Sequence, residues 1–203
     1  MQPGPKIIVF DYQAGRSGRH AQQFLQDWQG HLLVDDYGGY KALFAAARAH
    51  PETQLLLEPC IELACWAHAR RKFFDLFHAS QSPIAQEALN RIAPLYVIEA
   101  EGRDMSIDER QRLRVEKSRP LLSALHDWLQ QTRLRTAPNT ATAKAIDYSL
   151  KRWVALTRYA ETGDLPIDNN PVENSIRPIA LGKKNWLCVT RRRTHERKLK
   201  LAA

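Results

Sequence analysis

The chain has 203 residues, of which 44% are hydrophobic and 26% are charged, and its formal net charge is +8 at pH 7. These proportions are ordinary for globular domains and argue against a disordered or low-complexity chain. No apolar run approaches the roughly 18 residues of a membrane span, and the first residues lack a signal-peptide core. We expect a cytoplasmic protein with no membrane partner, and the positive charge makes nucleic acid the first partner to test.

The first third of the chain predicts strands that alternate with helices. Three short apolar runs are typical of strands: residues 7–10, 31–34 and 61–66. Three segments with apolar residues at helical spacing are predicted helices: residues 19–28, 40–49 and 67–78. This alternation indicates an α/β layer in which at least part of the sheet is parallel.

From about residue 83 the pattern becomes helical. The predicted helices cover residues 84–101, 106–132 and 140–160. Ser106 and Glu109 form a candidate capping box, and Pro120 should kink or divide the second helix. We interpret the three helices as a small bundle that packs its own core, and we assign no site to it. Basic residues lie opposite the apolar stripe of the third helix: Lys144, Lys151, Arg152 and Arg158.

The segment after the bundle predicts a further short helix. Asn170 is a good N-cap, Pro171 suits the first helical position, and Glu173 then falls in the first turn. A cap alone requires neither the polar residues 168–169 before it nor Arg177 one helical turn later. Arg177 is placed to orient Glu173 or to meet a phosphate by itself.

Two aspartates stand out at the end of a predicted strand. Asp35 and Asp36 follow residues 31–34 and precede two glycines. Carboxylates at a strand end suit Mg²⁺, which takes hard oxygen ligands and only one or two from the protein. The same residues are also common turn formers, so these residues alone leave both interpretations open. Glu173 is equally ambiguous, because a capping box would explain it without a metal.

A second candidate metal site involves cysteine and histidine. Cys60, Cys65 and His68 have the spacing C-x4-C-x2-H. A structural zinc site needs four ligands, and no second pair stands at a finger-like spacing. The chain has three cysteines, an odd number, so we favour reduced, buried thiols over zinc.

Two basic clusters lie near aromatic residues and near the candidate carboxylates. One contains Arg70 and Arg71, after the third predicted strand, and the other contains Lys183 and Lys184, just before Trp186. Basic side chains beside an aromatic ring suit phosphate contacts together with base stacking. A solvated helix face would produce the same pattern.

Four motifs, taken in order, are more specific than any one of them. They are LLVDDYGGY at 32–40, CWAHARRKFFD at 65–75, DNNPVE at 168–173 and RPIALGKKNW at 177–186. With them the chain closely resembles the insertion-sequence 66 family of bacterial transposases, from about residue 6 to residue 186. The resemblance implies a ribonuclease-H-like fold, an Asp-Asp-Glu triad, Mg²⁺ or Mn²⁺ as cofactor, and transposon-end and target DNA as partners.

The resemblance also implies roles for individual residues. Asp35 matches the second Asp of the triad, and Glu173 matches the Glu of the Asn-Asn-x-x-Glu motif. Asp36 occupies a position that is more usually small, so an exchange of roles between the two aspartates stays open. We predict Asp35 and Glu173 as catalytic and metal-binding residues. The predicted DNA-binding residues are Arg70, Arg71, Arg177, Lys183 and Lys184.

The chain departs from the family pattern at both ends. The family's first catalytic Asp lies on a first strand upstream of this chain, and Asp11 would fall on the second strand. We therefore expect an incomplete ribonuclease-H-like core without its first strand and with a large all-helical insertion. The expected parts are an α/β part (1–82), the helical insertion (83–162), a return to the core with the Glu helix (163–190) and a disordered basic tail (191–203).

Three functions remain open at this stage. In the leading hypothesis the chain is a truncated transposase fragment, from a family that cleaves DNA and transfers strands by two-metal chemistry. It would be inactive alone because the first Asp is missing. In the second, it is a DNA-binding remnant that modulates a full-length transposase, as a homo-oligomer or in a mixed assembly. In the third, it is a ribonuclease-H-like nuclease of another lineage. Most of the net charge lies in residues 191–203, so the DNA assignment rests on the motifs.

Overall fold

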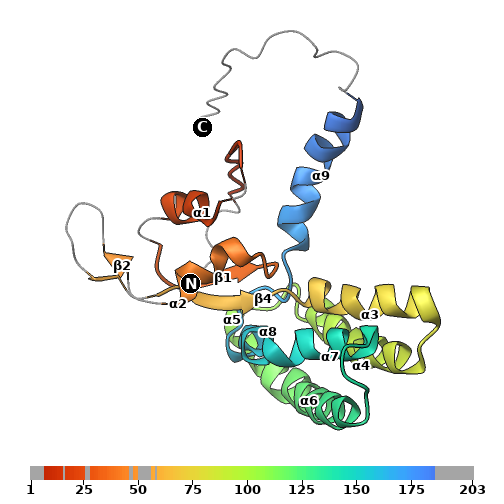
Figure 1. The fold of residues 1–203 in the computed structure, drawn as a ribbon. Helices are drawn as coiled ribbons and strands as arrows, with labels where there is room; N and C mark the ends of the chain where they lie inside the picture. The colour runs from red at the N-terminus through yellow and green to blue at the C-terminus, as the bar shows by residue number, and fades with distance from the viewer. Residues whose placement is uncertain are drawn as a thin grey trace. The chain divides into compact units, whose positions relative to one another are not determined.

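The computed structural model describes residues 7–15, 17–25, 28–45, 48–49, 56–57 and 59–185 (Figure 1). The chain is mostly helical and divides into two compact units, residues 1–169 and 170–203. No helix among the described residues is both long and apolar enough to cross a membrane.

The first unit contains two small sheets. Strand β1 (His31–Val34) pairs in parallel with β4 (Ile61–Ala64), so that Val34 lies opposite Ala64. Strand β2 (Arg48–Ala49) pairs antiparallel with β3 (Leu56–Leu57). Three short helical elements accompany the sheets: α1 (Gly18–Phe24), the 3₁₀ turn η1 (Gly38–Tyr40) and α2 (Lys41–Ala45). The predicted α/β character with a parallel pair is confirmed, and the ribonuclease-H-like core stays a prediction.

One predicted strand does not form. Residues 7–10 have no regular structure, and Ile7 is 73% exposed. A β-branched run becomes a strand only where a neighbouring strand accepts its hydrogen bonds, and no described strand pairs with this one. The predicted helix over 40–49 was also too long, because α2 ends at Ala45 and the chain then enters β2.

Helices follow β4 for the next hundred residues, as their sequence signals predict. Ser82 caps α4 by accepting a hydrogen bond from the Ala85 amide at 3.3 Å. The predicted capping box is present, with both bonds between Ser106 and Glu109 formed. The elements are α3 (Trp66–Ser80), α4 (Pro83–Glu101), α5 (Ile107–Leu113), α6 (Arg119–Leu134), α7 (Ala141–Lys151) and α8 (Trp153–Thr157).

Two predicted helices are divided. A π-helical stretch, η2 (Arg114–Ser118), separates α5 from α6 just before Pro120, in agreement with the predicted division. The helix expected over 140–160 breaks at Arg152, whose φ of −109° and ψ of 12° lie outside the helical region. A 3₁₀ turn, η3 (Arg158–Glu161), follows α8.

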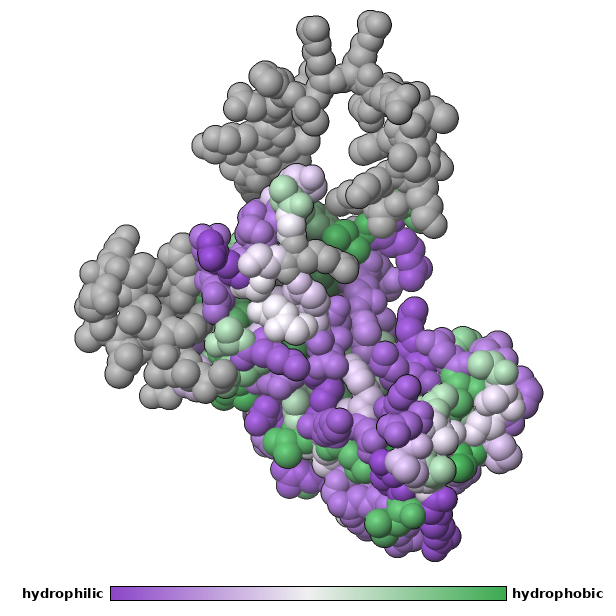
Figure 2. Space-filling model, viewed as in Figure 1, coloured by the Kyte–Doolittle hydropathy of each residue, from purple (hydrophilic) through white to green (hydrophobic). Residues whose placement is uncertain are grey.

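A single hydrophobic core joins β4 and α3 to the later helices. Its side chains include Phe73, Ile92, Leu125 and Ile146, all at most 1% exposed. Trp66 is fully buried, and its indole N–H donates to the Leu156 carbonyl oxygen at 2.7 Å. The sequence suggested that the helices after residue 83 pack only on each other. That expectation was wrong, because they share their core with β4 and α3. Their outer surface in Figure 2 is mostly hydrophilic, with scattered hydrophobic residues.

A buried arginine ties these helices together. Arg114 is 1% exposed and donates to both carboxylate oxygens of Glu99, at 2.8 and 2.5 Å. The same guanidinium donates to the carbonyl oxygens of Tyr159 and Thr162, at 2.8 and 2.7 Å. The network joins α4, η2 and η3, and it satisfies polar groups that would be costly to bury alone.

The second unit contains α9 (Asn170–Asn185). The helix begins where the Asn170-Pro171 signal predicts, and Glu173 lies in its first turn. It is longer than the short helix expected, and Pro178 lies inside it. Trp186 and the predicted basic tail over 191–203 lie outside the described residues.

Candidate metal and nucleic-acid site

Three segments that are distant in sequence meet at one edge of the β1–β4 sheet. Because the strands are parallel, Asp35 and Asp36 after β1 lie at the same edge as Cys65 after β4. The Cys65 thiol donates to the Asn169 amide oxygen at 2.9 Å, and the next backbone amide donates to the Ile167 carbonyl oxygen at 3.1 Å. Ligands of open α/β sheets commonly bind at the carboxyl ends of strands. The edge is therefore a candidate site.

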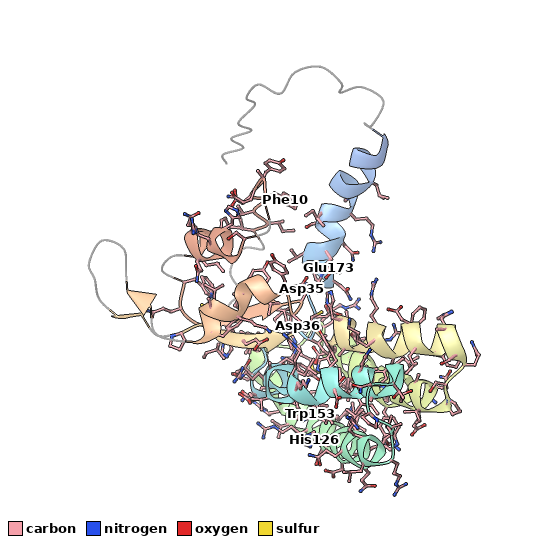
Figure 3. All side chains as sticks on the ribbon, in the orientation of Figure 1. Phe10, Asp35, Asp36, His126, Trp153 and Glu173 are labelled. Carbon is pink, nitrogen blue, oxygen red and sulfur yellow. The ribbon has the colours of Figure 1, made fainter. Side chains whose placement is uncertain are left out.

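Figure 3 labels the two aspartates that follow β1. They differ in conformation and in partners. Asp36 adopts φ 73°, in the left-handed region, and its carboxylate forms an ion pair with Arg152. Asp35 is exposed, and its carboxylate accepts a hydrogen bond from the Tyr37 amide at 3.1 Å. No described cationic side chain pairs with Asp35. This arrangement favours Asp35 as the carboxylate available to a metal ion.

Arg152 holds the turn after β1 against the helices. From the break between α7 and α8, its guanidinium donates to the Glu62 carboxylate at 2.5 Å and pairs with Asp36. It also lies 5.8 Å from the Tyr148 ring. Sequence reasoning assigned no site to the bundle and placed Arg152 among the basic residues opposite the apolar stripe of its helix. Its partners are 90 and 116 residues away, so helical periodicity carried no signal for them.

Buried groups lie behind this edge. Asp168 is 8% exposed. The pKa of the Tyr96 phenol is raised by the burial of Tyr96 itself and by the negative charge of Asp168. Burial also raises the pKa of the Cys65 thiol, which remains a neutral donor to Asn169. Cys60 is buried too and donates to the Trp28 carbonyl oxygen at 3.4 Å. The predicted burial of both thiols is confirmed.

Glu173, the second predicted ligand, lies on α9 of the second unit. It is partly buried in the first turn, where the helix dipole favours a negative charge. Because α9 belongs to a separate compact unit, the meeting of Glu173 with Asp35 stays a prediction.

Asp35 has the chemistry that a hard divalent cation requires. Its carboxylate is exposed and lies outside the Arg152 ion pairs, and Mg²⁺ needs only one or two such ligands. Within the described residues, no three or more His, Cys, Asp or Glu side chains are grouped so that they could hold a metal ion. The first unit therefore presents one exposed carboxylate at this edge, and the binding of a metal ion by Asp35 and Glu173 stays a prediction.

The predicted DNA-binding residues fall on two helices. Arg70 and Arg71 are exposed on α3, and the Arg70 guanidinium lies 5.7 Å from the Phe74 ring. Arg177 is exposed on α9. Lys183 and Lys184 belong to the same helix, but their side chains lie outside the described residues. DNA contacts by these five residues stay predictions.

Comparison with known proteins places these motifs in one family. The model of the transposase IS66 family matches residues 1–197. Uncharacterized protein y4hP of Sinorhizobium fredii is 34% identical over 195 residues, which covers 90% of this chain and 34% of that relative. Uncharacterized protein y4jD of the same organism is 34% identical over 187 residues, with 92% and 36% covered. The chain thus spans about a third of these relatives. No solved structure matches it significantly.

Proposed function

The chain belongs to the IS66 transposase family, and we propose that it carries part of the site at which such a transposase cleaves DNA and transfers the cut strand. The observation that carries this proposal is the sheet edge where Asp35 stands exposed beside the Cys65–Asn169 contact. The contact brings the Asp168-Asn169 end of the DNNPVE motif to the strand that precedes α3. Within the first unit, residues 168–169 and Cys65 therefore belong to the sheet edge that carries Asp35.

We propose the following roles for the residues of this chain. Asp35 and Glu173 would hold Mg²⁺ or Mn²⁺, which when bound activates the attacking hydroxyl and stabilises the leaving oxygen. Asp36 and Arg152 position the turn so that the Asp35 carboxylate stays outside the ion pairs. The residues proposed to bind DNA phosphates are Arg70, Arg71, Arg177, Lys183 and Lys184.

The proposal includes a ribonuclease-H-like core with the helices of residues 83–162 inserted in it. The parallel β1–β4 pair, with a carboxylate after β1, supports this fold. Asp35 and Glu173 are two carboxylates where the family resemblance implies three. We therefore expect these 203 residues by themselves to leave DNA uncut, and to act in the bacterial cytoplasm with a longer transposase.

A second candidate function is DNA binding without catalysis. In this form the chain modulates a longer transposase by occupying DNA, as a homo-oligomer or in a mixed assembly. The exposed cationic side chains of Arg70 and Arg71 on α3 favour it, because phosphate binding by these residues needs no metal ion. The two functions differ in one property, because only the first couples DNA binding to a divalent ion.

The test compares DNA binding by the purified chain in Mn²⁺ and in EDTA. If Asp35 and Glu173 join a metal ion to DNA phosphate, Mn²⁺ should tighten binding by about 5- to 150-fold, a typical coupling between two ligands. Asp35→Asn and Glu173→Gln should each remove this gain. Asp127→Asn, an equal change at an exposed aspartate of α6 outside the sheet edge, is the matched control and should keep it. Equal affinity in Mn²⁺ and EDTA would reject the metal site and support the second function.

A further inference from the structure

A pocket of about 630 Å³ lies within the first unit, between the turn after β1, α2 and α7. Its lining includes Tyr37, Tyr40 and Tyr148. Sites for small molecules and cofactors typically measure about 300–1,000 Å³. This pocket therefore has room for a single nucleotide but not for a duplex.

The aromatic rings of this pocket can accept a base. Tyr37 is 39% exposed, and its ring meets that of Tyr40 edge-on at 5.7 Å, so part of this aromatic pair faces solvent. The Tyr148 ring is already flanked by cations, with Lys72 Nζ at 5.2 Å and Arg152 at 5.8 Å. Bases within a duplex stack on each other, so aromatic side chains can stack only on unpaired bases.

Arginines offset most of the negative charge of the acidic residues in the pocket, because two guanidinium groups pair with three carboxylates. Asp36 and Glu62 both pair with Arg152. Asp147 pairs with Arg133 at 2.7 Å, and this hydrogen bond lowers the pKa of the Asp147 carboxyl. One carboxylate charge is left over, and the three lysines that line the pocket exceed it.

The lysines of the pocket keep their positive charge available. Lys41, Lys144 and Lys151 line it and are exposed, and none forms a salt bridge to a described carboxylate. Lys144 and Lys151 lie two turns apart on α7, or about 10 Å along the helix axis. This spacing suits different phosphates of one extended strand better than a single phosphate. The pocket therefore combines stacking surfaces with phosphate-binding groups.

We propose that this pocket binds one unpaired nucleotide of a DNA strand, with the base against the tyrosines and neighbouring phosphates on Lys144 and Lys151. The choice of DNA as ligand rests on the proposed function. Asp36 and Tyr37 line the pocket and directly follow Asp35, so a strand held here passes beside the proposed metal ligand. The pocket would position a strand end for reaction.

The test measures binding of a labelled thymidine oligonucleotide of about eight residues in EDTA, between about 50 and 200 mM salt. Each lysine that contacts a phosphate of a single strand contributes about 0.7 to the salt slope. The double variant Lys144→Ala/Lys151→Ala should therefore lower the slope by about 1.4. The control Arg112→Ala/Arg119→Ala removes equal charge from exposed residues outside the pocket and should leave the slope unchanged.

A second pair of variants tests stacking. Tyr37→Ala should weaken oligonucleotide binding by about tenfold, and Tyr37→Phe should restore it, because the ring remains. Equal salt slopes in the two double variants would overturn the proposal, as would tighter binding of the duplexed oligonucleotide than of the single strand. Because the measurement contains no divalent ion, loss of the Mn²⁺ effect would reject the metal site without rejecting the pocket.

Discussion

Two arginines organise two regions of the first unit in different ways. Arg114 lies in the interior, with its side chain 2% exposed and that of its partner Glu99 16% exposed. Arg152 lies at the sheet edge, where its side chain is 12% exposed and that of Asp36 is 38% exposed. The first network encloses its charges, whereas the second faces solvent and leaves Asp35 outside its ion pairs.

This difference separates polar groups that hold the fold from polar groups that are available to a ligand. Water cannot replace a lost partner of the buried Arg114, so the Glu99 carboxylate is required for stability. Water can reach the sheet edge, so loss of a partner there should cost less stability. Changes in the two regions should therefore separate folding from binding.

The largest expected effect comes from breaking the interior pair. Glu99→Ala leaves the Arg114 charge buried, and removal of one partner of a buried pair typically costs about 3–5 kcal/mol. Urea unfolding measures this loss. The control Glu101→Ala breaks an exposed pair with Lys117 and should cost no more than about 1 kcal/mol. Equal losses in the two variants would contradict the contrast.

The next effect concerns the turn beside the Arg114 network. A Cβ atom on Gly163 would collide with the Ile107 carbonyl oxygen, so Gly163→Ala must displace backbone. We expect a loss of about 1–3 kcal/mol in the free energy of unfolding. Gly38→Ala is the matched control at the sheet edge, because its new Cβ meets nothing within 4 Å. A stable Gly163→Ala protein would show that this turn can adjust.

A smaller effect distinguishes two substitutions of Asp36. Both Asp36→Ala and Asp36→Gly lose the pair with Arg152, but only glycine adopts φ 73° without steric cost. We expect Asp36→Gly to be more stable than Asp36→Ala by about 1 kcal/mol, measured as the difference in unfolding free energy. The opposite order would mean that this turn is not left-handed in solution.

The smallest effect is a decrease of folding stability at alkaline pH, caused by Tyr148 beside Arg152. Burial raises the pKa of Tyr148 to about 12, whereas an unfolded tyrosine ionises near pH 10. The folded chain thus holds this proton more tightly. Its contribution to stability is complete below about pH 10 and decreases as the pH rises toward 12. An absorbance titration of phenolate should lose a late-ionising group in Tyr148→Phe. If Tyr148→Phe instead removes a group that ionises near pH 10, the raised pKa of Tyr148 is contradicted.

Local signals in the sequence predicted much of the helical fold. Ser106 with Glu109, and Asn170 with Pro171, marked helix starts correctly because a cap involves only residues within one turn. The predicted strands over 31–34 and 61–66 formed, although the second ended at Ala64. The run 7–10 failed as a strand because strand formation needs a partner, which local composition does not specify.

The candidate site was predicted only in part, because its contacts join distant segments. Asp35 and Glu173 came from motifs, and the structure adds a reason to prefer Asp35 to Asp36. The Cys65–Asn169 contact spans 104 residues, and the pocket brings Tyr37 and Tyr148 together. Neither follows from periodicity. Arg152 was visible in the sequence as a basic residue, but its partners were not.

The most direct test of the sheet-edge metal site is paramagnetic broadening of backbone amide NMR signals by Mn²⁺ in amounts below one equivalent. Amides of Tyr37 and Cys65 should broaden first, because both lie at the edge beside Asp35. Asp35→Asn should abolish this broadening, and Asp127→Asn, at an exposed aspartate of α6, should preserve it. Unchanged broadening in Asp35→Asn, or broadening confined to other parts of the chain, would contradict the proposed role of Asp35.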